Sequence, residues 1–248
     1  MCDPIVDNLW NKPAFILELL MREMLKPAKE RLEWIQWADR DTIILDQCRP
    51  ISSFLPPETT NTSPFSSAWW RPKSNSNNQQ NHPEGAGLNT THLLVNNDLN
   101  GLNNGVFLLR VHPWSISLFT AILAFRHYKP DVELPFTEQS AMENVLATPE
   151  FNSQVRFVPQ SWFNAYPPEG GAEAFVNREG DRGEELKEEQ VRRGDYLVHF
   201  AGHEDKGRAM EEWVRALGMG MFGNRGGCRG MLVERLRVFG GGWGSGGD

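Results

Sequence analysis

The sequence has few cysteines, no long apolar run and no excess of positive charge, and each absence excludes a class of protein. Its three cysteines, at positions 2, 48 and 228, lie far apart, so neither a disulfide framework nor a cysteine-based zinc site can be read from them. The longest apolar stretch, residues 116–125, is too short to predict a membrane span. A formal net charge of −7 argues against non-specific binding of nucleic acid.

Signatures of two large enzyme classes are also missing. Residues 101–105 read Gly-Leu-Asn-Asn-Gly, which lacks the third glycine of a dinucleotide fingerprint. Neither a glycine-rich phosphate loop nor a Ser-His-Asp order is present, and the first four residues do not form a signal peptide. Kinase and dehydrogenase functions are therefore not expected.

Two stretches differ in composition from the rest of the 248 residues and divide the chain. More than half of residues 59–91 are Asn, Gln, Ser or Thr, which bury too little apolar area to offset chain entropy. We therefore expect a polar, disordered insertion over residues 59–100. Residues 218–248 are rich in glycine and show no helix or strand period, which predicts a disordered tail. Residues 1–58 and 101–217 are expected to form the two parts of one folded domain.

The remaining segments alternate between helix and strand patterns. Apolar residues at helical spacing predict helices that begin near Asn11, Pro113 and Thr137, and a last helix around Trp213. Short β-prone runs predict strands over residues 34–38, 42–45, 106–111, 155–158 and 196–200. This alternation predicts an α/β fold with a mixed, mainly parallel sheet flanked by helices, and with ligands at the carboxyl ends of the strands.

The strongest chemical signal is Asp39-Arg40-Asp41, which directly follows an apolar strand. Two carboxylates at this spacing can converge on a hard divalent cation and on the diphosphate that the cation binds. The competing interpretation is a solvated turn. The buried strand before the triplet favours a metal site, because open sheets place ligands at such positions.

His199 lies in the apolar run of residues 196–200, where a histidine satisfied within the core is the commoner interpretation. Gly202 favours a binding role, because a backbone without Cβ lets a bulky anionic ligand approach. His203 and Lys206 follow on a polar turn, where a cation can neutralise a leaving diphosphate; both are equally consistent with a simple surface position.

Amide and carboxylate side chains at two further places are candidates for binding sugar. Asn103, Asn104 and Gly105 precede an expected strand and are either turn formers or donors to sugar hydroxyls. Glu138 and Gln139 stand in the first turn of an expected helix, where an acidic residue favours the helix dipole and a glutamine amide can face an anomeric centre.

An aromatic loop offers a weaker alternative. Trp162, Phe163 and Tyr166 lie close to two prolines and are either packing residues or a platform on which sugars stack. The second interpretation predicts a carbohydrate-binding module.

Five ordered blocks resemble glycosyltransferase family 34, the fungal galactosyl- and mannosyltransferase family related to plant xyloglucan xylosyltransferases. The blocks are Trp37-Ala38-Asp39-Arg40-Asp41, residues 102–110, Trp114-Ser115, residues 137–141 and residues 198–202. The resemblance covers roughly residues 10–55 and 102–217. It implies a GT-A-like fold, a nucleotide-sugar donor, Mn²⁺ and transfer with retention of anomeric configuration.

The resemblance also implies roles for single residues. Asp39 and Asp41 match the metal-binding pair of acidic residues, and His199 matches the histidine that completes the metal's protein ligands. Gln139 matches the glutamine beside the donor's anomeric carbon, and Glu138 stands where plant members have aspartate.

Other matched positions contact the sugars or the diphosphate in the family. Asn103, Asn104 and Gly105 match the block that lines the donor and acceptor region. After residues 199–202 the plant pattern continues with cysteine and then lysine, whereas this chain has His203 next and Lys206 three residues later.

The expected function is therefore metal-dependent transfer of a hexose, mannose from GDP-mannose or galactose from UDP-galactose, to a glycan acceptor in glycoprotein or cell-wall polysaccharide synthesis. Family resemblance implies the lumenal side of the Golgi membrane and hetero-oligomers with other glycosyltransferases. The family's membrane anchor and first nucleotide-binding strands have no counterpart before residue 10. The alternative is thus an inactive fragment or pseudoenzyme that keeps a partner- or glycan-binding role.

Overall fold

The structure is a computed structural model that describes residues 8–55, 91–178, 186–218 and 237–240. The helices are α1 (Asn11–Met24), α2 (Pro113–Tyr128), α3 (Glu138–Leu146), α4 (Gly171–Asn177) and α5 (Lys206–Ala216), with short 3₁₀ turns η1 (Asn8–Trp10), η2 (Ile51–Phe54), η4 (Asn152–Gln154) and η5 (Gln160–Trp162). The strands are β1 (Trp34–Ala38), β2 (Thr42–Ile44), β3 (Leu93–Asp98), β4 (Gly101–Arg110), β5 (Val155–Phe157), β6 (Leu197–His199) and β7 (Arg237–Gly240).

Five strands form the main sheet in the order β5-β3-β4-β1-β7, and β2 and β6 form a second, two-stranded sheet. In the main sheet β3 with β5 and β1 with β7 are parallel, whereas β4 is antiparallel to both of its neighbours. The expected mixed α/β architecture is thus confirmed. Parallel pairs do not predominate, because β3 and β4 are joined by a tight turn, and a hairpin can only be antiparallel.

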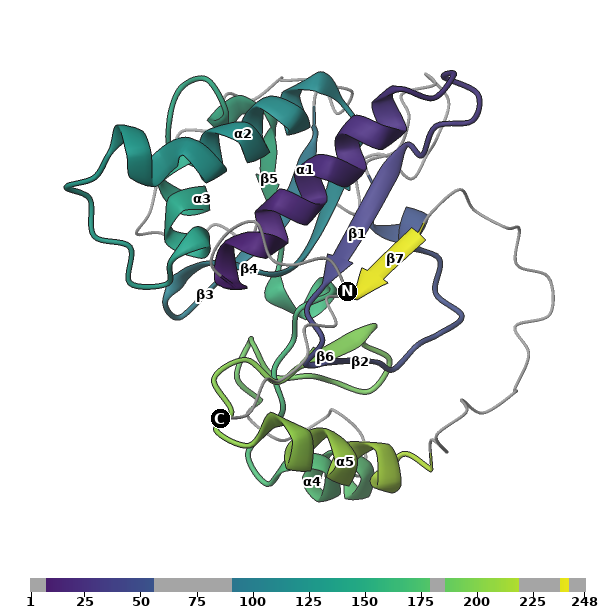
Figure 1. Cartoon of the computed structure of the whole chain (residues 1–248). Coiled ribbons are helices and arrows are strands. Elements are labelled where there is room, and N and C mark those ends of the chain that lie inside the picture. The colour runs from purple at the N-terminus through teal and green to yellow at the C-terminus, as the bar shows by residue number, and fades with distance from the viewer. Residues whose placement is uncertain (1–7, 56–90, 179–185, 219–236, 241–248) are drawn as a thin grey trace.

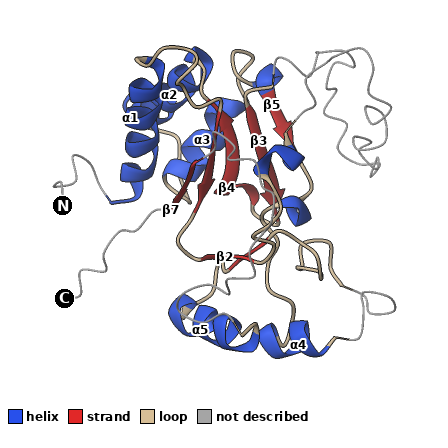
Figure 2. Cartoon of the chain, turned by 90° about the vertical axis from the view of Figure 1, so that its right-hand side faces the viewer, coloured by secondary structure: helices blue, strands red, loops and turns tan. Residues whose placement is uncertain are grey.

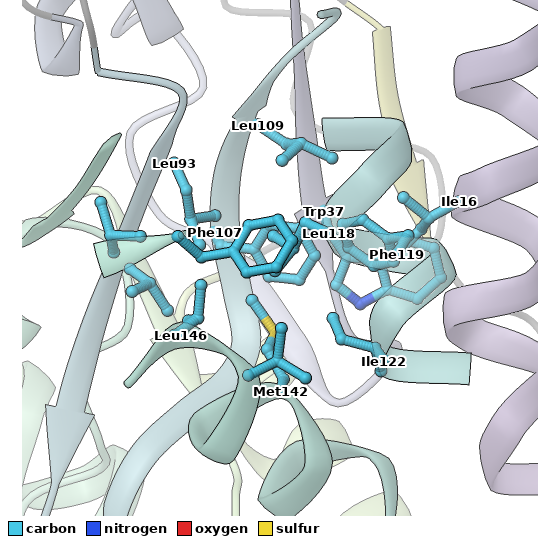
Figure 3. Close-up of a cluster of buried hydrophobic side chains, with 14 of the residues drawn as sticks. Ile16, Trp37, Leu93, Phe107, Leu109, Leu118, Phe119, Ile122, Met142 and Leu146 are labelled. Atoms are coloured by element: carbon cyan, nitrogen blue, oxygen red, sulfur yellow. The ribbon is translucent and has the colours of Figure 1, made fainter. Parts of the chain in front are cut away.

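Helices α1, α2 and α3 cover one face of the main sheet (Figure 1). Side chains alternate along each strand, so Ile35 and Trp37 of β1 and Phe107 and Leu109 of β4 share the face toward the helices. Figure 3 shows Trp37, Phe107 and Leu109 packed against side chains of α2 and α3, which are Leu118, Phe119, Ile122 and Met142. The helices predicted near Asn11, Pro113 and Thr137 therefore bury apolar side chains against this face of the sheet.

The other face of the main sheet carries a second cluster, which includes Trp34, Val106 and Leu108 and packs against Phe54 and Phe163. A third cluster joins β2 and β6 to helices α4 and α5, below the main sheet in Figure 2. The two sheets meet where β1 leads into β2, and only residues 39–41 separate these strands.

Three segments differ from the sequence-based expectation. Strand β3 lies inside residues 59–100, where a disordered insertion was expected; residues 56–90 lie outside the described part. Its Leu93, Leu94 and Val95 are at most 3% exposed, because hydrophobic clusters cover both faces of the strand. The short apolar run of these three residues indicated a strand, but the polar residues around it led to the prediction of disorder.

Part of the expected disordered tail is also ordered. Residues 237–240 form β7, which pairs in parallel with β1 (Figure 1); residues 219–236 and 241–248 lie outside the described part. Residues 103–105 do not form a turn before a strand, since β4 begins at Gly101 and includes them. None of the described helices is both long and apolar enough to cross a bilayer.

Candidate metal centre

Two carboxylates that are close together in the sequence and one distant histidine converge at the carboxyl end of β1. Asp39, Asp41 and His199 each offer one ligand atom, and these atoms all lie within 4.8 Å of one another. Asp39 directly follows β1, Asp41 directly precedes β2, and His199 is the last residue of β6. The structure therefore brings together the trio whose convergence the sequence analysis expected.

Backbone hydrogen bonds hold this convergence in place. The Asp39 N–H donates to the Gly105 carbonyl at 2.8 Å, which extends the β1–β4 pairing by one residue. Beyond the intervening turn, Thr42 of β2 pairs with His199 of β6, and the Phe200 N–H donates to the Asp41 carbonyl at 2.9 Å. The two carboxylates thus adjoin strands of different sheets, although one residue separates them.

Asp41 is the more buried carboxylate, at 6% exposed. Its Oδ2 accepts from Lys206 Nζ at 2.6 Å, and its Oδ1 lies 3.5 Å from His199 Nε2, beyond the usual range of a hydrogen bond. Burial acts to raise the pKa of Asp41, but the neighbouring His199 and Lys206 outweigh it and hold the pKa well below its usual range. Asp41 is therefore ionised at neutral pH.

Asp39 is more open, with its side chain 34% exposed. Its Oδ1 accepts from Trp37 Nε1 at 2.6 Å and lies 3.1 Å from Lys12 Nζ. Lys12 also donates to the carbonyl and to Oδ1 of Asn104, at 2.6 and 3.0 Å. Sequence reasoning missed Lys12, because nothing near it in the chain distinguishes it from other polar residues of an amphipathic helix.

His199 is fixed from two sides. Its Nδ1 lies 2.6 Å from Asn164 Oδ1, and the backbone of Gly105 passes so close that a Cβ there would lie 2.3 Å from the His199 Cε1. Sequence reasoning missed Asn164, which stands between aromatic residues in a loop. Only the three-dimensional arrangement places it beside the imidazole.

The candidate sugar-binding residues of β4 lie on an edge that α3 covers. The backbone that follows β1 pairs with β4 only from Gly105 onward, so the edge over residues 101–104 is open to side chains instead. There the Asn104 N–H donates to Gln139 Oε1 at 3.1 Å, which links Gln139 through Asn104 and Lys12 to Asp39.

Glu138 is in a different environment from its neighbour. It is buried, and its Oε2 accepts from Thr137 Oγ1 at 2.6 Å. Thr137 has a φ of 47° and makes no capping hydrogen bond to α3. The carboxylate of Glu138 thus bonds to the residue before it, at the start of α3.

The loop after β6 brings the last predicted residues to the rim of the centre. Gly202 has a φ of +74°, the left-handed region that favours glycine, and a Cβ on it would meet no heavy atom within 4 Å. His203 is exposed and packs edge-on against Phe200, whereas Lys206 reaches Asp41. An open depression beside this loop is lined by Gly202, His203 and residues of α5, but not by the three metal-donor side chains.

The aromatic loop does not form an exposed platform. Phe163 is 1% exposed in the second core cluster, and Trp162 packs near Phe54. The Tyr166 hydroxyl donates to Asp98 Oδ2 and accepts from Asn103 Nδ2, and burial together with Asp98 raises the pKa of Tyr166. The contacts of these rings are those of packing and hydrogen bonding, the first of the two interpretations.

Comparison with known proteins gives one family and a few structures. The sequence profile of the galactosyl transferase GMA12/MNN10 family matches residues 5–209. No curated protein matches the chain. The galactosyltransferase LgtC, solved in complex with donor and acceptor sugar analogs, is similar with a TM-score of 0.42 and 14% identity, over 85% of this chain and 68% of that one. An active-site mutant of LgtC gives a TM-score of 0.39 and 14% identity over 78% and 64% of the two chains.

Proposed function

The chain belongs to the galactosyl transferase GMA12/MNN10 family, a family of hexosyltransferases, and from this premise we propose that it is a metal-dependent, retaining enzyme. It transfers mannose from GDP-mannose or galactose from UDP-galactose to a glycan acceptor in glycoprotein or cell-wall polysaccharide synthesis. The observation that carries the proposal is the convergence of Asp39, Asp41 and His199 within 4.8 Å.

The three donor side chains fit the Mn²⁺ ion that the family implies. Two carboxylates and one imidazole are a ligand set that suits a first-row divalent cation, and its other positions remain for diphosphate oxygens. His199 Nε2 and Asp41 Oδ1, 3.5 Å apart, would hold the ion together with Asp39. When bound, Mn²⁺ supplies Lewis-acid stabilisation of the departing nucleoside diphosphate.

Fixed charges at the rim support the same reaction. Negative charge develops on the leaving diphosphate, so a preorganised cation is most useful beside it. Lys206 is such a cation, because its Nζ reaches Asp41 while its side chain remains 46% exposed. Gly202 and His203 lie in the loop between β6 and Lys206, and we assign them to this side of the proposed donor site.

The opposite side of the proposed donor site comes from β4 and α3. Asn103, Asn104 and Gly105 line the region between donor and acceptor, and Gln139 presents its amide near the anomeric carbon, with its Oε1 held by the Asn104 N–H. Glu138 supports Gln139 from the preceding position. An amide is a poor nucleophile, so this arrangement does not favour a covalent glycosyl-enzyme intermediate. It favours attack by the acceptor hydroxyl on the same face of the anomeric carbon from which the diphosphate departs.

The family context extends the proposal to location and partners. We place the protein at the lumenal side of the Golgi membrane, where nucleotide sugars and glycan acceptors meet, and in hetero-oligomers with other glycosyltransferases. Co-purification with lumenal transferases tests this part.

Replacing one carboxylate tests the catalytic proposal. The protein is assayed with Mn²⁺ for nucleoside diphosphate release from UDP-galactose and from GDP-mannose, beside Asp41→Asn and the matched control Asp46→Asn. Asp46 is a nearby carboxylate paired with Arg49 outside the metal-donor trio. We expect activity with one donor, its loss in Asp41→Asn and its retention in Asp46→Asn.

Equal activity of Asp41→Asn and the unaltered protein would overturn the metal role. Calorimetric titration of UDP and of GDP with Mn²⁺ separates the alternative function. If neither nucleotide gives heat, the chain keeps the fold as a partner- or glycan-binding protein without turnover.

A further inference from the structure

Three buried asparagines connect His199 to an acidic side chain at the end of β3. Asn96, Asn103 and Asn164, which we call the asparagine triad, are at most 5% exposed. Asn164 Nδ2 donates to Asn96 Oδ1 at 2.8 Å and to Asn103 Oδ1 at 3.0 Å. Asn164 Oδ1 lies 2.6 Å from His199 Nδ1. The triad is thus a continuous hydrogen-bonded path to the imidazole.

The amide of Asn103 has only one orientation that satisfies its neighbours. The Gly105 backbone N–H donates to Asn103 Oδ1 at 2.8 Å, and a backbone N–H cannot accept, so this atom must be oxygen. At the other end Asn103 Nδ2 lies 2.9 Å from Asp98 Oδ2, and an ionised carboxylate only accepts. The Tyr166 hydroxyl donates to the same Asp98 oxygen and so accepts from Asn103. A backbone amide and a carboxylate therefore fix the direction of the path.

That direction passes to Asn164 and then to His199. Because Asn103 presents an oxygen, the group that faces it at 3.0 Å must be the Asn164 nitrogen; the flipped amide would place two oxygens at that distance. Asn164 Oδ1 then faces His199 and can only accept. The proton shared at 2.6 Å must accordingly be carried by His199 Nδ1.

We infer that Asn164 is a positioning residue that holds His199 in the tautomer protonated at Nδ1 and directs the unprotonated Nε2 toward Asp41. In this tautomer the neutral ring places an acceptor 3.5 Å from Asp41 Oδ1. Two facing acceptors are stabilised by a cation between them, which is the role that the proposed function assigns to Mn²⁺. The inference rests on the proposed function for the identity of that cation, whereas the proton on Nδ1 follows from the asparagine triad alone.

Nuclear magnetic resonance measures the tautomer directly. Long-range ¹H–¹⁵N correlation spectra of the metal-free protein at alkaline pH distinguish protonated from unprotonated ring nitrogens, and the His199 signals are those missing from His199→Gln. We expect a protonated Nδ1 and an unprotonated Nε2. In Asn164→Ala the acceptor is lost, so the share of the Nδ1–H tautomer falls, and the Mn²⁺ affinity measured by calorimetry falls about 10- to 100-fold.

A matched pair of variants separates positioning from general stability. Asn164→Asp and Asn164→Ala both lose the two bonds that Nδ2 donates, but only the aspartate keeps an acceptor for His199. We expect Asn164→Asp to retain the Nδ1–H tautomer. Tyr196→Phe, which loses a buried hydrogen bond to Gln36 away from the triad, controls for loss of stability and keeps the tautomer.

Two results would overturn the inference. One is a His199 protonated at Nε2 in the unaltered protein, and the other is an equal share of the Nδ1–H tautomer in Asn164→Ala and in the unaltered protein. Failure of the proposed function looks different. If the Nδ1–H tautomer is present and depends on position 164 while Mn²⁺ does not bind, the positioning role stands and the metal assignment fails.

Discussion

Replacing Gly105 by alanine tests how tightly the centre is packed. Gly105 lies in the interior of β4 without a positive φ, so its glycine is not required by the backbone conformation. A Cβ there would lie 2.3 Å from the His199 Cε1, 3.0 Å from the Asn103 Oδ1 and 3.1 Å from the His199 Nδ1. Because real Cβ atoms do not approach so closely, the imidazole or the strand must move.

The size of the effect follows from two opposing contributions. Alanine in a strand interior ordinarily stabilises by up to about 1 kcal/mol over glycine, because the unfolded chain loses freedom. Overpacking a rigid site costs about 1–3 kcal/mol, and His199 is held on its other side by Asn164. We expect a net loss of about 1–2 kcal/mol. The displaced imidazole also weakens Mn²⁺ binding.

Urea unfolding and Mn²⁺ calorimetry measure both effects, and Gly207→Ala is the matched control. A Cβ on Gly207 would have its nearest contact at 3.7 Å, to Asp205 Oδ1, and the residue lies in the first turn of α5. There the same substitution is expected to stabilise by about 0.5–1 kcal/mol. The reasoning is refuted if Gly105→Ala is as stable as the unaltered protein and binds Mn²⁺ equally well.

Two further predictions concern stability away from the centre. Burial, with the charges of His112 and Arg110, lowers the pKa of His92 from 6.5 to about 4, so His92 takes up a proton more readily in the unfolded chain than in the folded state. The free energy of unfolding therefore keeps its full value above pH 6.5 and falls by up to about 3 kcal/mol as the pH drops toward 4. Urea unfolding at pH 7 and pH 4.5 measures this, and a slope as steep in His92→Gln as in the unaltered protein would contradict it. Trp213→Ala removes a ring that is 2% exposed and packs against Phe175 and Phe200, so we expect a loss of about 3–5 kcal/mol in the same assay, and a loss below 1 kcal/mol would show that this cluster does not stabilise the fold.

The elements that could be predicted from the sequence are those whose patterns are local. The stripe of α1 and the apolar run of β1 required only residues close together in the chain, and β1 lies at the predicted residues 34–38. Strand β3 was missed because only its first half is apolar, and its burial depends on partners 60 residues later as well as on its own hairpin. Pairing partners of this kind leave no local pattern.

The centre divides in the same way. Asp39 and Asp41 could be predicted from their spacing after a strand, and His199 could be predicted from its position at the end of another strand. Lys12 and Asn164 had no such signal, since their importance comes from side chains 92 and 35 residues away. Lys206 is displaced in sequence from the family pattern, yet the first turn of α5 brings it to Asp41.

The placement of Asp39 and Asp41 beside strands of different sheets has a mechanical consequence. An ion held by both carboxylates and by His199 would link the five-stranded sheet to the two-stranded sheet, because neither sheet alone provides all three ligands. Ligand at a hundredfold excess over its dissociation constant adds about 2.7 kcal/mol to the state that binds it. The added free energy would oppose local unfolding that separates β6 from β1. Amide exchange in β2 and β6 would therefore slow with Mn²⁺, whereas exchange in α1 and α2 would not.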